Sequence, residues 1–270
     1  MALHIELLRG RLTSRIPGEP VVLDDPESYL LHIDTASTWM AYEDLSNLLN
    51  ERIFAYEGAP LGGLEVRRED DEDQHDRIEV KGHLRHQLDL PFEIEGVPEI
   101  TSEGEIRMRT SSMEVLGIGV RDLLDTFGAE VEDMIVTRES RGVRIEGDDM
   151  VLQPGRMLAP PLTEGTVSDV EVGARALAMT FGGSGPASSS SDPRAPTADP
   201  GDRAQPFISY RGGRVRLGRM TMTDTDIMIV DDDPTDAFRF RPAEMNRQLV
   251  AGYVKLLEDG GLTIFAPDAP

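Results

Sequence analysis

Residues 78–100 read IEVKGHLRHQLDLPFEIEGVPEI, and the pattern of this stretch decides the fold class. Apolar residues or glycine occupy alternate positions over Ile78–Leu84, and the alternation resumes over Leu88–Ile94 after a slip at 85–87. A period of two places successive side chains on opposite faces of a strand, so one face is buried and the other is solvated. Pro91 and the glycines favour bends or bulges. The stretch therefore predicts long, bending strands of an antiparallel sheet.

The same period recurs along much of the chain. Alternating apolar residues are found over 3–7, 29–33, 106–115, 143–152, 167–181 and 207–229. Gly212–Gly213 interrupts the last of these segments and predicts a hairpin turn.

Helical spacing appears in fewer places. Leucines and Ile53 recur at intervals of three and four over Tyr42–Phe54, and a wider apolar stripe covers about four turns over Val120–Thr137. A further short helix is expected over Ala243–Leu257. The predicted fold class is α+β and β-rich: a long curved antiparallel sheet packed around or against one long helix, with shorter helices.

One segment separates the chain into parts. Residues 183–206 consist almost entirely of Gly, Ser, Pro, Ala and Asp, a composition that buries too little apolar surface to fold. We therefore expect a main domain over 1–182, a disordered loop or linker over 183–206, and hairpin strands with a short helix over 207–270 that complete the sheet.

The charge of the chain excludes some partners. The sequence holds 27 Lys+Arg against 50 Asp+Glu, a formal net charge of −23, which argues against nucleic acid and anionic membrane surfaces. All the basic residues are Arg except Lys81 and Lys255. This halophilic composition fits a GC-rich host with a salty cytoplasm better than a surface built for a cationic partner. The chain has no cysteine, which excludes disulfides and thiolate chemistry.

The sequence contains no apolar run long enough for a signal-peptide core or a membrane-spanning helix. A soluble, cytoplasmic protein is the expectation, and an envelope location would follow if the natural start lay upstream. The pattern makes no prediction of oligomeric state.

Motifs that would carry chemistry are weak. Asp231–Asp236 is a dense carboxylate cluster, but it lacks the calcium-loop pattern and is typical of a solvated turn. His83 and His86 would point to opposite faces of a strand. The Gly117–Gly119 segment has Asp122 where a dinucleotide fingerprint needs its third glycine. We therefore predict no catalytic residue, no metal site and no cofactor.

Several segments resemble a known family. They are Ile106–Ile118 running into Val120–Ile135, Val143–Leu152, and Pro160–Pro161 with the strand start at Gly165–Val167. Over about residues 28–182 the chain resembles the tubular lipid-binding (TULIP-like) proteins, including bacterial LmeA-type phospholipid-binding relatives. It also resembles an uncharacterised bacterial family in a pattern matched at Arg211–Gly213, Asp233–Asp236 and Gln248–Tyr253.

The TULIP-like resemblance implies a curved sheet that wraps a helix and leaves an apolar seam for a lipid or another apolar molecule. The residues expected to bind that ligand are Leu88, Leu90, Phe92, Leu123, Leu124, Phe127, Val131 and Met134. Further methionines would give adaptable walls, and those named for this are Met108, Met113, Met150, Met157, Met179, Met220 and Met222. One alternative is a packed structural or assembly module without a cavity. Another is a metal-dependent enzyme that uses the Asp231–Asp236 loop.

Overall fold

The structure is a computed structural model, and it divides into two compact units that we describe separately. Unit 1 comprises Met1, Met40–Met157 and Val170–Ala178, and unit 2 comprises Ala2–Trp39, Leu158–Asp169 and Met179–Pro270. The residues that the structure describes are 1–69, 76–85, 89–115, 118–119, 137–138, 141–158, 160–182, 207–233, 235–241, 244–256 and 261–270.

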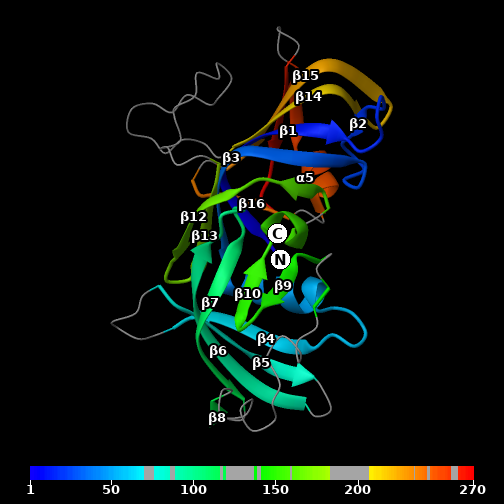
Figure 1. Ribbon diagram of the computed structural model, residues 1–270. Helices are drawn as coiled ribbons and strands as arrows, with labels where there is room; N and C mark the ends of the chain where they lie inside the picture. Colours follow the sequence, from blue (N-terminus) through cyan, green and yellow to red (C-terminus); the bar gives the residue numbers. More distant parts are fainter. Residues whose placement is uncertain are drawn as a thin grey trace. The chain divides into compact units, whose positions relative to one another are not determined.

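Unit 1 is built on a seven-stranded antiparallel sheet with the order β4-β5-β6-β7-β10-β9, in which β8 also pairs with β7 (Figure 1). Its strands are β4 (Leu61–Arg68), β5 (Ile78–Arg85), β6 (Asp89–Ile100), β7 (Ile106–Val115), β8 (Ile118–Gly119), β9 (Val143–Glu146) and β10 (Asp149–Leu152). Helix α1 (Tyr42–Leu48) continues into the π-helical turn η1 (Leu49–Ile53), and α4 (Pro154–Met157) follows β10.

Unit 2 contains most of an eleven-stranded sheet with the order β12-β13-β3-β1-β14-β15-β18-β17, to which β11, β16 and β2 add at β3, β1 and β14. Helix α5 (Met245–Ala251) belongs to the same unit. The strands are β1 (Leu3–Ser14), β2 (Val21–Val22), β3 (Tyr29–Ala41), β11 (Leu162–Glu164), β12 (Val167–Val172), β13 (Ala176–Phe181), β14 (Phe207–Leu217), β15 (Met220–Asp231), β16 (Phe238–Phe240), β17 (Tyr253–Leu256) and β18 (Leu262–Ala266). The unit boundary falls within β3, β12 and β13.

The centre of this sheet is buried. Ile208, Ile229 and Ile264 lie side by side on β14, β15 and β18, and each is at most 3% exposed. Strand β14 pairs parallel with β1, and β18 pairs parallel with β15. Central strands made of such apolar runs are typical of positions covered on both faces.

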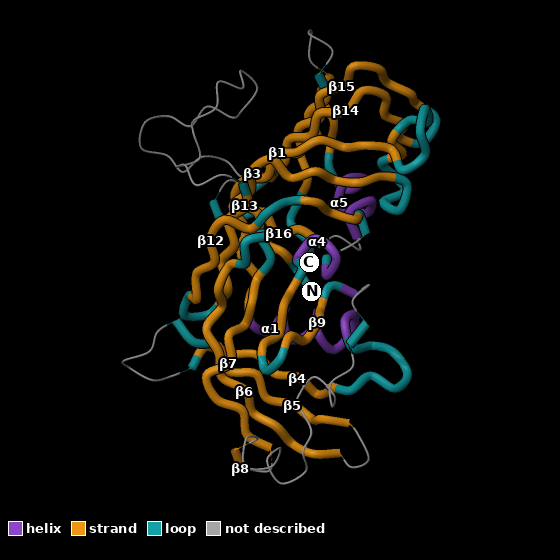
Figure 2. Tube along the Cα trace, in the orientation of Figure 1, coloured by secondary structure: helices purple, strands orange, loops and turns teal. Residues whose placement is uncertain are grey.

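The predicted fold class is wrong. Strands make up 59% and helical turns 12% of the structure, and the described strands form two sheets rather than one (Figure 2). The longest helical stretch among the described residues is the 12-residue run Tyr42–Ile53, and no long helix is found there. The predicted long helix over Val120–Thr137 falls almost entirely outside the described residues. The larger sheet is also mixed rather than antiparallel, because β14 and β18 join parallel neighbours.

Several element predictions can be compared directly. The helix over Tyr42–Phe54 is confirmed, and so are the strands over the described residues Ile78–Arg85 and Asp89–Ile100. The hairpin at Gly212–Gly213 is wrong: β14 passes through both residues, and the chain reverses at Gly218, whose φ of 57° suits glycine.

The helix predicted over Ala243–Leu257 is shorter, since α5 ends at Ala251 and β17 follows it. Residues 183–206 lie outside the described part, and the domain division at 182 and 207 stays a prediction.

Candidate functional site

The candidate site is an apolar pocket in unit 1, between α1–η1 and one face of the seven-stranded sheet. The helical segment contributes Leu45 and Leu49, and Phe54 follows directly after it. Leu177 of β13 also lines the pocket. The remaining lining residues come from the sheet and the β9–β10 turn: Leu61, Leu64, Val66, Ile78, Val80, Phe92, Ile94, Met108, Thr110, Met113, Ile145, Asp148, Met150 and Leu152.

A bulge in β7 helps to build this face. Glu95 of β6 lies opposite Ser112, whereas Gly96 lies opposite Thr110, so one residue of β7 is left over between them. Thr110 and Met113 would point to opposite faces of a regular strand. Because of the bulge, both line the pocket.

A second irregularity lies in β4, between Gly62 and Glu65. Gly63 adopts a φ of 59°, a left-handed conformation that favours glycine. This irregularity brings both Leu61 and Leu64 onto the pocket face. The glycines of β4 therefore shape the site as directly as its apolar side chains do.

Gly82 of β5 allows two wall residues to meet. A Cβ atom at this position would lie 2.6 Å from Leu64 Cδ2 and 3.1 Å from Phe92 Cε1. Both side chains are buried, so a larger residue at this position would displace the wall of the pocket.

Side chains of the helical segment hold it against the edge strand β4. The Asn50 side-chain amide donates to the Leu64 carbonyl at 2.6 Å, and the Leu64 amide donates to Asn50 Oδ1 at 2.8 Å. The Val66 amide donates to Ser46 Oγ at 2.8 Å. These bonds satisfy backbone groups of β4 that have no further strand to pair with, because β4 ends the sheet.

The pocket is only partly enclosed. Its enclosed volume is about 50 Å³. The wall nearest the helix is fully buried, as at Leu61, Leu64 and Phe92. Other wall residues remain partly exposed, namely Val80, Ile94, Met108, Met113, Ile145 and Met150. An apolar face therefore continues outward from the enclosed space.

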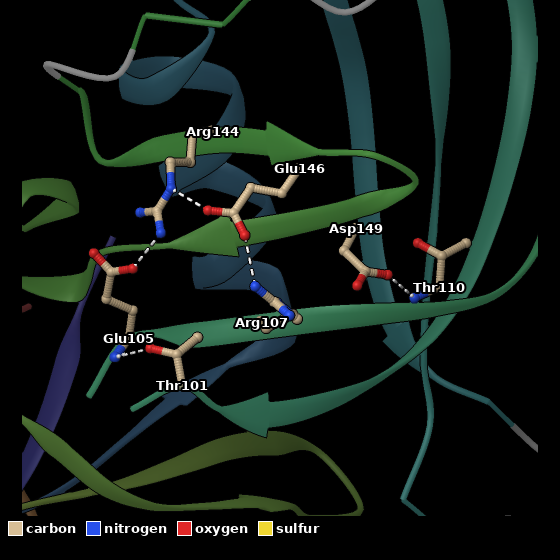
Figure 3. Close-up of polar contacts among 7 residues, drawn as sticks. All are labelled: Thr101, Glu105, Arg107, Thr110, Arg144, Glu146 and Asp149. Carbon is tan, nitrogen blue, oxygen red and sulfur yellow. Dashed lines mark hydrogen bonds and ion pairs between the residues drawn. The ribbon is translucent and has the colours of Figure 1, made fainter. Parts of the chain in front are cut away.

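The opposite face of the same sheet carries ion pairs (Figure 3). Arg144 of β9 donates to Glu105 at 2.6 Å and to Glu146 at 2.8 Å, and Arg107 of β7 donates to Glu146 at 2.5 Å. The hydrogen bond from Arg144 lowers the pKa of Glu105 and outweighs the effect of burial. The ion pairs thus join β9 to β7 and to the residue before β7, across the intervening strand β10.

A second group on this face surrounds a buried carboxylate. Glu79 of β5 is 5% exposed and accepts from Arg67, and Lys81 Nζ lies 3.1 Å from Glu79 and 2.7 Å from Glu93. Burial of Glu79 favours its neutral form, but the hydrogen bonds from its neighbours prevail and lower its pKa to about 2. Glu79 is therefore held ionised by its cationic neighbours.

An open groove of about 380 Å³ lies on the charged face beside these residues. Gly63 and Gly82 contribute no side chain to it, and its charged lining includes Glu65, Lys81 and Glu114. The ammonium group of Lys81 is already paired with Glu79 and Glu93, so it is not available as an anion site.

Of the eight residues predicted to bind a ligand, the structure describes two, Phe92 and Leu90. Phe92 lines the pocket. Leu90 is partly buried in β6 and is not part of the lining. The others lie outside the described residues: Leu88, Leu123, Leu124, Phe127, Val131 and Met134.

Among the methionines named as adaptable walls, Met108, Met113 and Met150 line the pocket. Met157 and Met179 are buried elsewhere, and Met220 is 45% exposed. Sequence reasoning missed Leu45 and Leu49, although the helical spacing of Tyr42–Phe54 marked them as a buried face.

Asp232, Asp233, Thr235 and Asp236 are exposed, as in the solvated turn that the sequence suggested, but Asp231 at the end of β15 is not. Asp231 is 0% exposed, and its Oδ1 accepts from the Asp233 amide at 3.0 Å. Burial raises its pKa to about 7, and Asp268, Asp236 and Asp233 act in the same direction. In the described part of the chain no group of three or more His, Asp or Glu residues is arranged to hold a metal ion.

Comparison of the chain with family models, with curated proteins and with solved structures finds no match. The TULIP-like resemblance therefore stays a hypothesis. Within the described ranges, no helix is long and apolar enough to cross a membrane.

Proposed function

We propose that unit 1 binds an apolar small molecule, such as an acyl chain, along the pocket face of the seven-stranded sheet. The observation that carries the proposal is the partly exposed apolar wall, which includes Ile94, Met108 and Met113, beside an enclosed apolar space. The other face of the same strands follows the usual rule for a solvated surface, with paired charges at Arg107 and Arg144.

The size of the pocket limits how a ligand can lie. A water molecule needs about 10–15 Å³ of such space, so an enclosed volume of about 50 Å³ holds a few waters or the end of a chain. The rest would lie along the outer wall, where methionine side chains adapt readily to an irregular partner. Burial there contributes about 25 cal/mol for each Å² of apolar surface removed from water.

The same small volume supports a second candidate. A structural or assembly module needs no ligand space, and about 50 Å³ is small beside the roughly 300–1,000 Å³ of most ligand pockets. This candidate predicts that unit 1 binds no apolar probe. In both cases the net charge of −23 disfavours a nucleic-acid partner.

The two candidates separate in a binding titration with N-phenyl-1-naphthylamine, an uncharged dye that fluoresces when it leaves water. Ligand binding at the pocket predicts saturable fluorescence in the whole protein. Met113→Gln places an amide in the apolar wall, and we expect affinity to fall about tenfold because an unpaired buried amide costs about 1–3 kcal/mol.

Glu114→Gln is the matched control, since Glu114 is the next residue of β7 and lines the groove on the other face. Its affinity should equal that of the unmodified protein. Absence of saturable binding would favour the packed module, and equal losses in both variants would move the site away from the pocket. Organic extraction of the purified protein adds an independent measurement, in which co-purified lipid supports the binding proposal.

A further inference from the structure

The polar end of the pocket restricts which head group an apolar ligand can carry. Thr110 and Asp148 are the polar residues among the described lining, and Asp148 is its one charged side chain. Both lie at the β7 and β9–β10 side of the pocket. No basic side chain belongs to the lining that the structure describes.

The hydrogen-bond donors of Thr110 are already used. Its hydroxyl donates to the Asp148 carbonyl at 2.6 Å. Its amide donates to Asp149 Oδ1 at 3.0 Å, as Figure 3 shows. Toward a ligand, the Thr110 hydroxyl can therefore only accept, and the Asp148 carboxylate is an acceptor as well. The side chains of Thr110 and Asp148 therefore act as acceptors toward a ligand at this end of the described lining.

The arginines of β7 and β9 are not available to pair with an anionic head group in the pocket. Arg107 and Arg144 belong to the ion-paired face, where Glu146 and Glu105 neutralise them. Arg109 pairs with Glu99 at 3.2 Å. A carboxylate or phosphate head at Thr110 and Asp148 would meet the negative charge of Asp148, and no basic side chain of the described lining would pair with it.

From this arrangement we propose that the pocket selects apolar ligands whose head group donates hydrogen bonds, an alkylammonium or an alkyl alcohol, and discriminates against alkyl carboxylates and phosphates. The inference rests on the proposed function and deepens it by naming the ligand class. The same chain would then bind in the order ammonium, alcohol and carboxylate, from tightest to weakest.

The test uses three ligands with one chain: decylammonium, decanol and decanoate, each measured by displacement of N-phenyl-1-naphthylamine from the whole protein. The titrations are made in about 0.15 M sodium chloride, where the screening length is about 8 Å, and the overall charge of −23 is controlled by comparing two variants that each lose one charge. We expect decanoate to bind several-fold more weakly than decylammonium, because an exposed charge pair contributes up to about 1 kcal/mol.

Asp148→Asn removes the charge at the pocket, and Glu146→Gln removes the same charge from the other face of the same hairpin. We expect the first variant to lose several-fold affinity for decylammonium and to keep its affinity for decanol. The second should leave the order unchanged. Asp148 is an exposed turn residue, so its replacement leaves the core intact.

Each outcome decides one question. If the dye binds and decanoate is the tightest of the three ligands, or if Asp148→Asn leaves the decylammonium affinity unchanged, the head-group inference is wrong while the proposed function stands. If neither the dye nor any of the ligands binds, the proposed function itself is wrong, and the inference falls with it.

Discussion

Glu79 and Asp231 are both buried carboxylates on strands, one in each unit. Their surroundings shift their pKa values in opposite directions. Glu79 lies among Arg67 and Lys81, and its pKa falls from 4.5 to about 2. Asp231 lies among Asp233, Asp236 and Asp268, and its pKa rises from 3.8 to about 7. Burial disfavours the charged form at both positions, so the sign of the shift depends on the neighbours.

The comparison shows that the charged neighbours of a buried carboxylate decide whether its ionised form is stabilised. On the charged face of the sheet in unit 1, each described carboxylate cluster includes an arginine or lysine. At the end of β15, burial and the carboxylates of Asp268, Asp236 and Asp233 raise the pKa of Asp231, against the backbone hydrogen bond from Asp233. Unit 1 therefore gains stability from ionised carboxylates, whereas the Asp231 cluster opposes folding once its acids ionise.

The largest effect is expected from Asp231→Asn. A rise of about three pKa units corresponds to a cost of at most about 4 kcal/mol for ionised Asp231 in the folded protein. Because the surroundings relax around the charge, we expect Asp231→Asn to raise the unfolding free energy by about 2 kcal/mol near pH 8. The amide keeps an oxygen to accept from Asp233. Since the folded pKa lies above the unfolded one, the penalty is absent below about pH 4 and grows until about pH 7.

Denaturant titrations of Asp231→Asn and of the unmodified protein across this pH range measure that difference. Asp232→Asn, at the exposed neighbouring position, is the control for loss of one charge. A gain that does not depend on pH would contradict the assignment of the penalty to Asp231 ionisation.

A slightly smaller effect of opposite sign is expected from Glu79→Gln. Loss of hydrogen bonds to charged partners should lower the unfolding free energy by about 1–2 kcal/mol at neutral pH. The folded pKa of Glu79 lies below the unfolded one, so its contribution is complete above about pH 5 and is lost as the pH falls toward 2. Glu99→Gln is the control, because Glu99 forms an exposed ion pair with Arg109. An equal loss of unfolding free energy in both variants would contradict the claim that the buried Glu79 contributes more than an exposed carboxylate.

The smallest effect is expected from Glu146→Gln. Glu146 bonds to both Arg107 and Arg144, but its side chain is 39% exposed. Surface ion pairs contribute about 0–1 kcal/mol, so we expect a change within about 0.5 kcal/mol. Thermal unfolding at low and high salt measures it. If Glu146→Gln lowered the unfolding free energy as much as Glu79→Gln, burial would not explain the difference between Glu146 and Glu79.

The local pattern of the sequence predicted much of the secondary structure. The alternation over residues 78–94 identified β5 and β6, and the leucine spacing of Tyr42–Phe54 identified α1 and η1. The pairing of strands was not predictable in the same way. Strand β14 joins β1 in parallel although 200 residues separate Leu8 from its partner Ile208, and no local period encodes such a partner.

The pocket was predictable only in part. Phe92 and the methionines at 108 and 113 stood out by their alternation, and they line the pocket. The bulge between Glu95 and Gly96 was not predictable, and without it Thr110 and Met113 would not share a face. The polar end follows instead from the pairing of β7 with β10, in which Met108 lies opposite Met150 and the Thr110 hydroxyl donates to the Asp148 carbonyl.

The bonds from Ser46 and Asn50 to β4 have a consequence for the motions of unit 1. The Leu64 and Val66 amides are protected by side chains of the helical segment and not by a neighbouring strand. Their hydrogen exchange with solvent therefore requires that this segment move away from the sheet. These two amides serve as built-in reporters of how often the pocket opens, on a timescale of minutes to hours that binding measurements do not reach.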